Sequence, residues 1–320
     1  MLHLALEGER AALCARLFAE TTCDGVYTHG VNRFLRFVEM IRNGSIDVLA
    51  EPTRVSGHGA IERWNGHLAP GNISAYSSMH RAMALAREHG LGCVALGNTN
   101  HWLRGGTYGW LAADEGFVAI CWTNTLPNLP AWGSINPVLG NNPLVIAAPR
   151  PAGNVVVDMA MSQFSYGTLA AYANAGKLLP VDGGFDAAGN LTRDAAAVEA
   201  SQRALPVGYW KGSALSFILD LIGAMLGAGL ATHQLTTDYH KESGISQFFL
   251  AIDPSRVAAA AELNQIADNI VASLQHAKPI DPANPVRYPG QKTLQLREEN
   301  MRLGVPVDEK LWRQLQELSF

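Results

Sequence analysis

A histidine and an arginine stand four residues apart in the segment 28–33, which reads THGVNR. An apolar stripe at helical spacing follows from Phe34, so a helix with Thr28 as its N-cap would place His29 and Arg33 on one face. Two basic side chains near a helix N-terminus oppose the helix dipole, and a bound anion would relieve that conflict. A surface arginine beside a histidine held by a local hydrogen bond is the simpler interpretation, and the spacing alone favours it.

A second candidate is the polar, glycine-rich segment 97–106 (GNTNHWLRGG), which follows a run of apolar residues. Loops that leave buried strands commonly hold ligands in α/β proteins. His101 and Arg104, set among small polar groups, could therefore hold a polar ligand. A tight turn from strand to helix, with Asn98 and Asn100 supplying the turn geometry, explains the segment equally well.

Two weaker candidates suit a ligand with phosphate or hydroxyl groups. Lys211 lies in the segment 208–213 (GYWKGS) at the expected start of a helix, where free N–H groups favour phosphate, although exposed lysines are also common there. Asp158, Ser162 and Ser165 follow an apolar strand and could bond ribose hydroxyls. Capping of the next helix by Ser162 or Ser165 explains these residues at least as well.

Several familiar sites are absent from the sequence. No expected strand is followed by G-x-G-x-x-G, so a dinucleotide site here would differ from the Rossmann pattern. The sequence also lacks the G-x-S-x-G, P-loop and H-E-x-x-H motifs. The ten histidines do not cluster at metal-ligand spacing, so we expect no metal. The four cysteines form no C-x-x-C pair and indicate free thiols in a reducing compartment.

Composition indicates a globular protein with a sizeable core, because 48% of the 320 residues are apolar and only 16% are charged. The net charge of -4 gives no reason to expect nucleic acid or an anionic membrane as a partner. The first residues lack the pattern of a signal peptide. The most apolar window, 213–231, contains Asp220 and is expected to be a buried helix. We therefore expect a cytoplasmic protein with no membrane partner.

Hydrophobic periodicity predicts helices near both ends of the chain, and helices alternating with short strands between them. Helices are expected up to residue 23 and at 34–43, 73–90, 165–175, 211–230, 258–274, 293–304 and 308–318. Strands are expected at 93–96, 118–121, 144–148, 155–157 and 247–252, whereas 45–72 is expected to be irregular. The fold class is thus α/β (α+β), with an α/β domain at 66–259. A discontinuous helical domain is expected from residues 1–65 and 260–320.

Eight segments together make the chain similar to the malate/L-lactate dehydrogenase family that lacks a Rossmann fold. The likeness runs from about residue 11 to the C-terminus. Its segments are THGVNRF (28–34), NTNHWLRGGTYGW (98–110), CWTN (121–124), NPL (142–144), VDMAMSQFSYG (157–167), LPVDGGFD (179–186), GYWKGS (208–213) and YPG (288–290). The resemblance implies a non-Rossmann nucleotide-binding sheet beside a helical domain formed by both chain ends. It also implies a homodimer whose active site lies near the subunit contact.

Roles follow from the same resemblance, position by position. His29 resembles the family's acid catalyst, Arg33 a ligand of the substrate carboxylate, and His101 a second active-site histidine. A histidine titrates near neutral pH and can protonate the alkoxide left by hydride delivery, while an arginine can bind the adjacent carboxylate with two parallel hydrogen bonds. The residues that match cofactor-contacting segments are Asp158, Met159, Ser162, Ser165, Trp210, Lys211, Pro289 and Gly290.

The implied reaction is hydride transfer from NADH to a small keto acid, specifically a diketo sugar acid. NADP is the alternative to NAD, because no residue that reads the ribose can be located without the Rossmann pattern. A dehydrogenase of another 2-hydroxy acid, such as malate, lactate or ureidoglycolate, is the first alternative function. A carboxylate- or sugar-acid-binding protein without turnover is the second.

Overall fold

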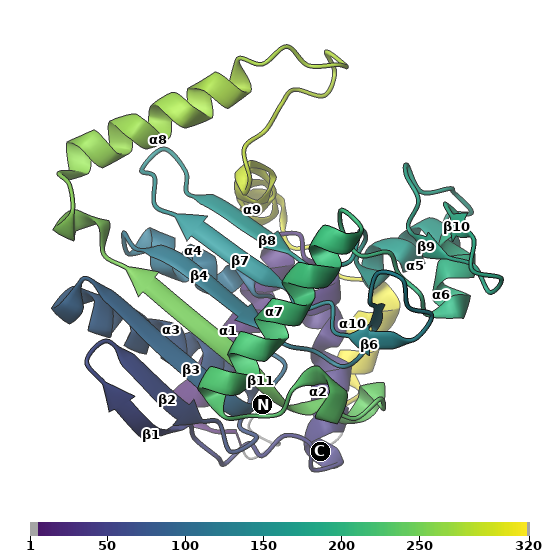
Figure 1. Ribbon diagram of the computed structural model, residues 1–320, viewed down its shortest axis with the longest axis horizontal. Helices are drawn as coiled ribbons and strands as arrows, with labels where there is room; N and C mark the ends of the chain where they lie inside the picture. The colour runs from purple at the N-terminus through teal and green to yellow at the C-terminus, as the bar shows by residue number, and fades with distance from the viewer. Residues whose placement is uncertain (1–5, 319–320) are drawn as a thin grey trace.

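A seven-stranded sheet forms the centre of the computed structural model, which describes residues 6–318 (Figure 1). The strand order is β1-β2-β3-β11-β4-β7-β8; β2 and β3 run parallel, and the other neighbours are antiparallel. Its strands are β1 (Thr53–His58), β2 (Ile61–Asn65), β3 (Leu91–Asn100), β4 (Val118–Thr123), β7 (Leu144–Ala148), β8 (Val155–Met159) and β11 (Ser243–Ile252). This mixed and mainly antiparallel sheet confirms the expected fold class and the absence of a Rossmann arrangement.

Helices cover both faces of the sheet because side chains alternate between the faces along each strand. On β4, Ala119 and Cys121 pack in the cluster formed with α3 and α4, whereas Trp122 packs with α7 on the other face. Trp122 Nε1 also donates a hydrogen bond to Leu219 O of α7 at 2.9 Å. The helices are α1 (Gly8–Cys23), α2 (Phe34–Arg42), α3 (Gly71–His89), α4 (Gly106–Asp114), α5 (Tyr166–Asn174), α6 (Ala195–Ser201), α7 (Trp210–Gly227), α8 (Ala260–Gln275), α9 (Gln291–Leu303) and α10 (Glu309–Gln316).

Two groups of elements lie outside the central layers in Figure 1. The first contains α5, α6 and a two-stranded sheet of β9 (Gly184–Phe185) and β10 (Leu191–Thr192), and it forms the right-hand edge of the view. The second is α8, which projects from the upper left. A second two-stranded sheet pairs β5 (Leu129–Pro130) with β6 (Pro137–Leu139).

The prediction that 45–72 is irregular was wrong, because β1 and β2 form a hairpin at the edge of the central sheet. Every residue of β1 is exposed, so this edge strand lacks the alternation of apolar and polar residues that indicates a half-buried strand. The sheet therefore includes residues that the predicted division had placed in the helical domain.

The two ends of the chain lie together, as the sequence predicted. Asn300 of α9 donates to the carbonyl of Cys23, the last residue of α1, at 2.7 Å. Arg297 of α9 forms an ion pair with the buried Asp24. At the far end, Asp308 caps α10 as expected, accepting a hydrogen bond from Leu311 N at 2.9 Å.

The apolar window 213–231 is helical up to Gly227, where α7 ends, and α7 buries only one side against the sheet. Phe217 and Met225, on its other side, are 58% and 68% exposed. Of the helices within residues 6–318, none is both long enough and apolar enough to span a bilayer.

Candidate active site

His29 does not lie on a helix that begins at Thr28, and this expectation was wrong. The segment forms two 3-10 turns, Tyr27–His29 and Val31–Arg33, and α2 begins only afterwards at Phe34. Instead of capping a helix, the Thr28 hydroxyl bonds His29 Nδ1 at 2.9 Å.

Gly30 explains why the chain turns twice here. Its backbone packs so closely against α1 that a side chain at Gly30 would collide with Thr22 Oγ1. The Thr22 hydroxyl in turn accepts a hydrogen bond from Val31 N at 2.8 Å. This contact fixes the position of His29 relative to the end of α1.

The imidazole ring of His29 stacks on that of His101, with ring centroids 5.8 Å apart and planes inclined by 20°. His101 directly follows β3, and its Nδ1 accepts a hydrogen bond from Leu103 N at 3.0 Å. In the neutral ring the proton of His101 is therefore on Nε2. The two candidate segments of the sequence thus meet at their histidines.

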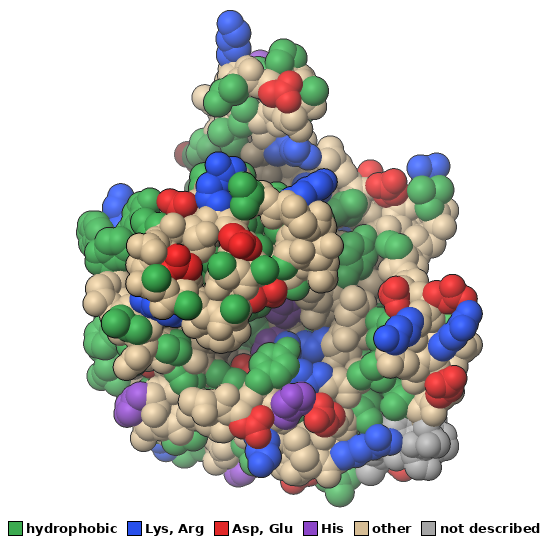
Figure 2. Space-filling view, turned by 90° about the vertical axis from the view of Figure 1, so that its right-hand side faces the viewer, with side chains coloured by type: hydrophobic (Ala, Val, Ile, Leu, Met, Phe, Trp, Pro, Cys, Tyr) green, Lys and Arg blue, Asp and Glu red, His purple; other side chains and the backbone are tan. Residues whose placement is uncertain are grey.

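Both histidines are neutral near pH 7. Burial, followed by the positive charges of Arg33, Arg104 and Arg36, lowers the pKa of His29 to about 4. Burial, followed by Arg33, His29 and Arg36, lowers the pKa of His101 well below its usual value. Arg33 thus acts on both imidazoles, so the histidine and arginine of the first motif converge on one site. Figure 2 shows a hollow in the molecular surface with histidine and basic side chains in its depth.

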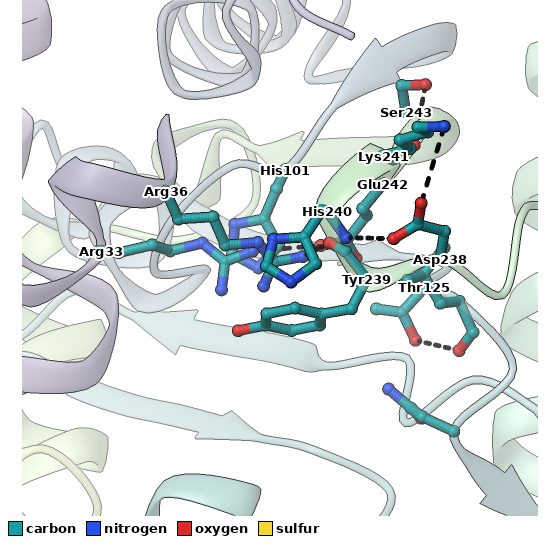
Figure 3. Close-up of polar contacts among 12 residues, drawn as sticks. Arg33, Arg36, His101, Thr125, Asp238, Tyr239, His240, Lys241, Glu242 and Ser243 are labelled. Atoms are coloured by element: carbon teal, nitrogen blue, oxygen red, sulfur yellow. Dashed lines mark hydrogen bonds and ion pairs between the residues drawn. The ribbon is translucent and has the colours of Figure 1, made fainter. Parts of the chain in front are cut away.

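Arg33 shares an acidic partner with Arg36, which lies in the first turn of α2. The Nη2 atoms of Arg33 and Arg36 lie 3.1 and 3.2 Å from the same oxygen, Oε2 of Glu242. These side chains are 12%, 10% and 7% exposed, respectively. Glu242 lies between the 3-10 turn Tyr239–Lys241 and β11, and the ring of Tyr239 covers the Arg36 guanidinium (Figure 3).

The sequence reasoning missed Arg36, Tyr239 and Glu242. Arg36 could have been identified from the sequence, because a third basic residue in the same short segment adds to the unfavourable interaction with the helix dipole. The sequence gives no such indication for Glu242, because only the folded chain brings the 3-10 turn Tyr239–Lys241 and the following Glu242 against α2. Within the part of the chain that the structure describes, no group of His, Cys, Asp and Glu side chains could hold a metal ion.

Arg104, the other basic residue of the segment 97–106, has a structural role. Its Nη1 pairs with Asp24 Oδ2 at the end of α1, and its Nε lies 3.6 Å from Asp158 Oδ2. Arg297 of α9 binds the same Asp24 with two nitrogens, at 2.6 and 2.9 Å. This cluster of Asp24, Arg104 and Arg297 joins both chain ends to the loop that carries His101.

The segments matched to cofactor contacts lie next to one another in the fold. Pro289 accepts a hydrogen bond from Val156 N of β8 at 3.0 Å. After β8, Ser162 pairs with Pro206 in an isolated bridge, shortly before Trp210 and Lys211 begin α7. Further along, Gly167 packs against the side chain of Thr28, beside His29. The stretch from β8 to Gly167 therefore forms a path along the chain from the contact with Pro289 to Thr28, next to His29.

The polar side chains on this path differ in whether they already form hydrogen bonds within the protein. Ser165 caps α5 by accepting from Thr168 N at 3.1 Å, as the alternative interpretation expected. Asp158 accepts from Gly106 N at 2.9 Å. Ser162 is buried, and its hydroxyl has no partner among residues 6–318. Buried hydroxyls normally have a partner, so Ser162 is the member of the path that most needs a ligand.

The chain is similar to a known enzyme family over nearly its whole length. The chain matches the family described as malate/L-lactate dehydrogenase over residues 1–316. The 2,3-diketo-L-gulonate reductases of Citrobacter koseri and Klebsiella pneumoniae are each 44% identical to it, with 99% of this chain and 96% of each relative covered. Malate dehydrogenase from Pyrococcus horikoshii has a similar structure, with a TM-score of 0.87 at 26% identity and coverage of 98% of this chain and 89% of that one. Sulfolactate dehydrogenase from Methanocaldococcus jannaschii shares the fold, with a TM-score of 0.90 at 24% identity and coverage of 98% and 91%.

Proposed function

The chain belongs to the malate/L-lactate dehydrogenase family, and on that basis we propose that it reduces 2,3-diketo-L-gulonate to 3-keto-L-gulonate with NADH. It is an oxidoreductase that acts on CH–OH groups. One observation carries the choice of substrate. A chain that is 44% identical to 2,3-diketo-L-gulonate reductases over 99% of its length also brings His29, His101 and Arg33 together at one site.

Arg33 binds the substrate carboxylate and His29 protonates the oxygen of the adjacent carbonyl. The product keeps its oxo group at carbon 3, so the reduced carbonyl is at carbon 2, next to the carboxylate. The guanidinium of Arg33 offers paired N–H donors that match a carboxylate and fix the carbonyl beside it. With the substrate held in this way, the carbonyl oxygen meets the stacked histidines.

His29 gains its proton when the substrate binds. In the unliganded protein burial, and after it the cations around His29, keep its pKa at about 4. A carboxylate on Arg33 offsets part of that positive charge, so the pKa of His29 rises and the ring can carry a proton for delivery. His101, stacked on His29 with its proton on Nε2, donates a second hydrogen bond to the developing alkoxide.

A nicotinamide cofactor, as the family implies, supplies the hydride when bound. Ser162 fits such a ligand, because its buried hydroxyl has no partner in the described chain and lies on the path that leads to His29. Lys211, exposed in the first turn of α7, suits a phosphate of the cofactor. Gly290, where a side chain would crowd Trp110 and Val156, keeps the backbone of its segment against β8. The remaining cofactor contacts are proposed at Asp158, Met159, Ser165, Trp210 and Pro289, and NAD is proposed over NADP.

We also propose a homodimer in the cytoplasm. The outer side of α7 carries exposed apolar residues at helical spacing, a pattern typical of a subunit contact: Phe217, Ile218, Leu221 and Met225. The same helix begins with the proposed cofactor residues Trp210 and Lys211, so a partner on this face would lie near the active site. Light scattering in solution measures the mass, and a monomer at all concentrations would contradict this part of the proposal.

A substrate panel tests the function. The protein is mixed with NADH or NADPH and one keto acid at a time, or with NAD or NADP and malate, lactate or ureidoglycolate, and the absorbance of the reduced cofactor is followed. Fastest turnover with 2,3-diketo-L-gulonate and NADH is expected. Faster turnover of malate or lactate would favour the first alternative, a dehydrogenase of another 2-hydroxy acid. The similarity of the fold to that of malate dehydrogenase supports this alternative. Ligand binding without any turnover would favour the second alternative, a carboxylate- or sugar-acid-binding protein without catalysis.

A further inference from the structure

The cluster of Arg33, Arg36 and Glu242 has more positive than negative charge. Two guanidinium groups share one carboxylate oxygen, and none of the three side chains is more than 12% exposed. His29 and His101 are neutral and add no negative charge. A buried charge that lacks a counter-ion is unfavourable, so the cluster is incomplete until an anion joins it.

Arg36 is the member with unused hydrogen-bonding capacity. Its Nη2 donates to Glu242 and to the carbonyl of Tyr239, but Nε and Nη1 are buried and have no partner among residues 6–318. Buried N–H groups of a guanidinium are rarely left unpaired. The ring of Tyr239 covers them, and Tyr239 is 56% exposed on a short 3-10 turn. Movement of this ring would open the Arg36 donors to the site.

The position of Arg36 relates these free donors to the substrate. Arg36 follows Arg33 by three residues, so both guanidinium groups reach the same carboxylate from one side, and Figure 3 shows them directed toward His101 and Glu242. The charge of Arg36 also contributes, after burial and the charge of Arg33, to the lowered pKa of both histidines. With the substrate carboxylate on Arg33 and its carbonyl at His29, the next carbon of the substrate, carbon 3, would lie near Arg36.

We propose that Arg36 is a specificity-determining, substrate-binding residue that shares the carboxylate with Arg33 and donates to an oxygen on the carbon next to the reacting carbonyl. The inference rests on the proposed function and deepens it. It names the preferred substrate class as 2-keto acids that carry an oxo or hydroxyl group at carbon 3. A 2-keto acid without that oxygen leaves the free donors of Arg36 unpaired.

A matched pair of substrates tests this assignment. Pyruvate and 3-hydroxypyruvate differ by one hydroxyl at carbon 3, and kcat/KM is measured for both with NADH. The variants are Arg36→Lys, which keeps the charge but has fewer donors, and Arg16→Lys, a control on the half-exposed surface of α1. Where a compound is not turned over, its inhibition constant against 2,3-diketo-L-gulonate replaces kcat/KM. Arg36→Gln repeats the comparison if thermal unfolding shows that Arg36→Lys is not folded.

The wild type and Arg16→Lys are expected to prefer 3-hydroxypyruvate. Arg36→Lys is expected to reduce that preference by about tenfold to hundredfold, as for one hydrogen bond to a charged group, with the affinity for NADH unchanged. An active wild type whose preference survives in the folded Arg36 variant, or a variant that loses both substrates equally, overturns the inference and leaves the proposed function standing. A wild type that reduces no keto acid overturns the proposed function, and the inference with it.

Discussion

The imidazole rings of His29 and His101 lie nearly parallel, with centroids 5.8 Å apart, in a site where burial and neighbouring arginines disfavour a positive charge on either ring. Two protonated imidazoles at this distance would repel each other, so at most one of the two rings is positively charged at a time. His29 becomes the charged ring in the proposed mechanism, while His101 stays neutral.

Replacement of His29 is the direct test of its role. His29→Asn removes the proton donor and keeps much of the side-chain volume, so kcat is expected to fall by about 10²–10⁴-fold. The affinity for NADH, followed by fluorescence titration, should not change. His276→Asn, at an exposed histidine, is the control and should behave like the wild type. Normal turnover by His29→Asn would refute the mechanism.

The depressed pKa of His29 predicts how stability depends on pH. Between about pH 6.5 and pH 4 the unfolded chain binds a proton at His29 and the folded chain does not, so the free energy of unfolding falls as the pH falls. In this window His29→Asn should gain stability relative to the wild type, by up to about 1.4 kcal/mol per pH unit. Urea unfolding of both proteins at a series of pH values measures the difference. A difference that does not vary with pH would contradict the low pKa.

Glu242→Gln removes the only carboxylate that Arg33 and Arg36 contact in residues 6–318. Breaking a buried ion pair leaves charge uncompensated, so we expect the free energy of unfolding to fall by about 3 kcal/mol or more. Oxamate, an anionic analogue of a keto acid, should raise the melting temperature of the variant more than that of the wild type. Glu309→Gln, at an exposed ion pair on α10, should have almost no effect. Equal responses to oxamate in Glu242→Gln and wild type would argue against an anion site here.

Gly30→Ala places a methyl group where Thr22 Oγ1 lies. The backbone must shift to relieve the overlap, at a cost of about 1–3 kcal/mol in stability. Because the shift moves His29 away from His101, kcat should fall at least tenfold even under conditions where the variant is folded. The matched control is Gly223→Ala in α7, where the added methyl group makes only ordinary contacts. Full activity in Gly30→Ala would contradict this prediction and show that the site tolerates a shift of the 3-10 turn that carries His29.

Ser162 and Ser165 provide a paired test of cofactor binding. Ser162→Ala removes a buried hydroxyl that has no protein partner in the described chain, so stability should not fall, whereas the affinity for NADH should drop about two- to tenfold. Ser165→Ala removes the cap of α5 and should cost about 1 kcal/mol of stability. Isothermal titration with NADH and thermal unfolding of both variants separate the two effects. An unchanged NADH affinity in Ser162→Ala would remove Ser162 from the proposed cofactor site.

The sequence predicted those features that depend on short-range patterns. Most helices were expected within a few residues of their observed ends, because an apolar stripe and residues such as Gly90 and Asp308 mark them locally. The β1–β2 hairpin was missed because an exposed edge strand carries no periodic signal. The 3-10 turns at His29 were also missed, since they depend on a contact between Gly30 and Thr22 of another helix.

The candidate site divides in the same way. His29, Arg33 and His101 could be named from two short segments and a family resemblance. Glu242 could not, because its contact with Arg33 exists only once the 3-10 turn Tyr239–Lys241 has been placed beside α2. The partner of a buried charge is a property of the tertiary structure, and the spacing of residues in the chain does not reveal it.

The buried cluster of Asp24, Arg104 and Arg297 makes turnover depend on the last part of the chain. Arg297 comes from α9, far from either histidine in sequence, yet it holds the same aspartate that fixes the loop carrying His101. A chain cut just before α9 would keep both histidines and Arg33, Arg36 and Glu242. It would nevertheless lose the ion pair of Arg297 with Asp24 that supports this loop. Truncation or substitution near the C-terminus should therefore abolish activity without changing any residue that contacts the substrate.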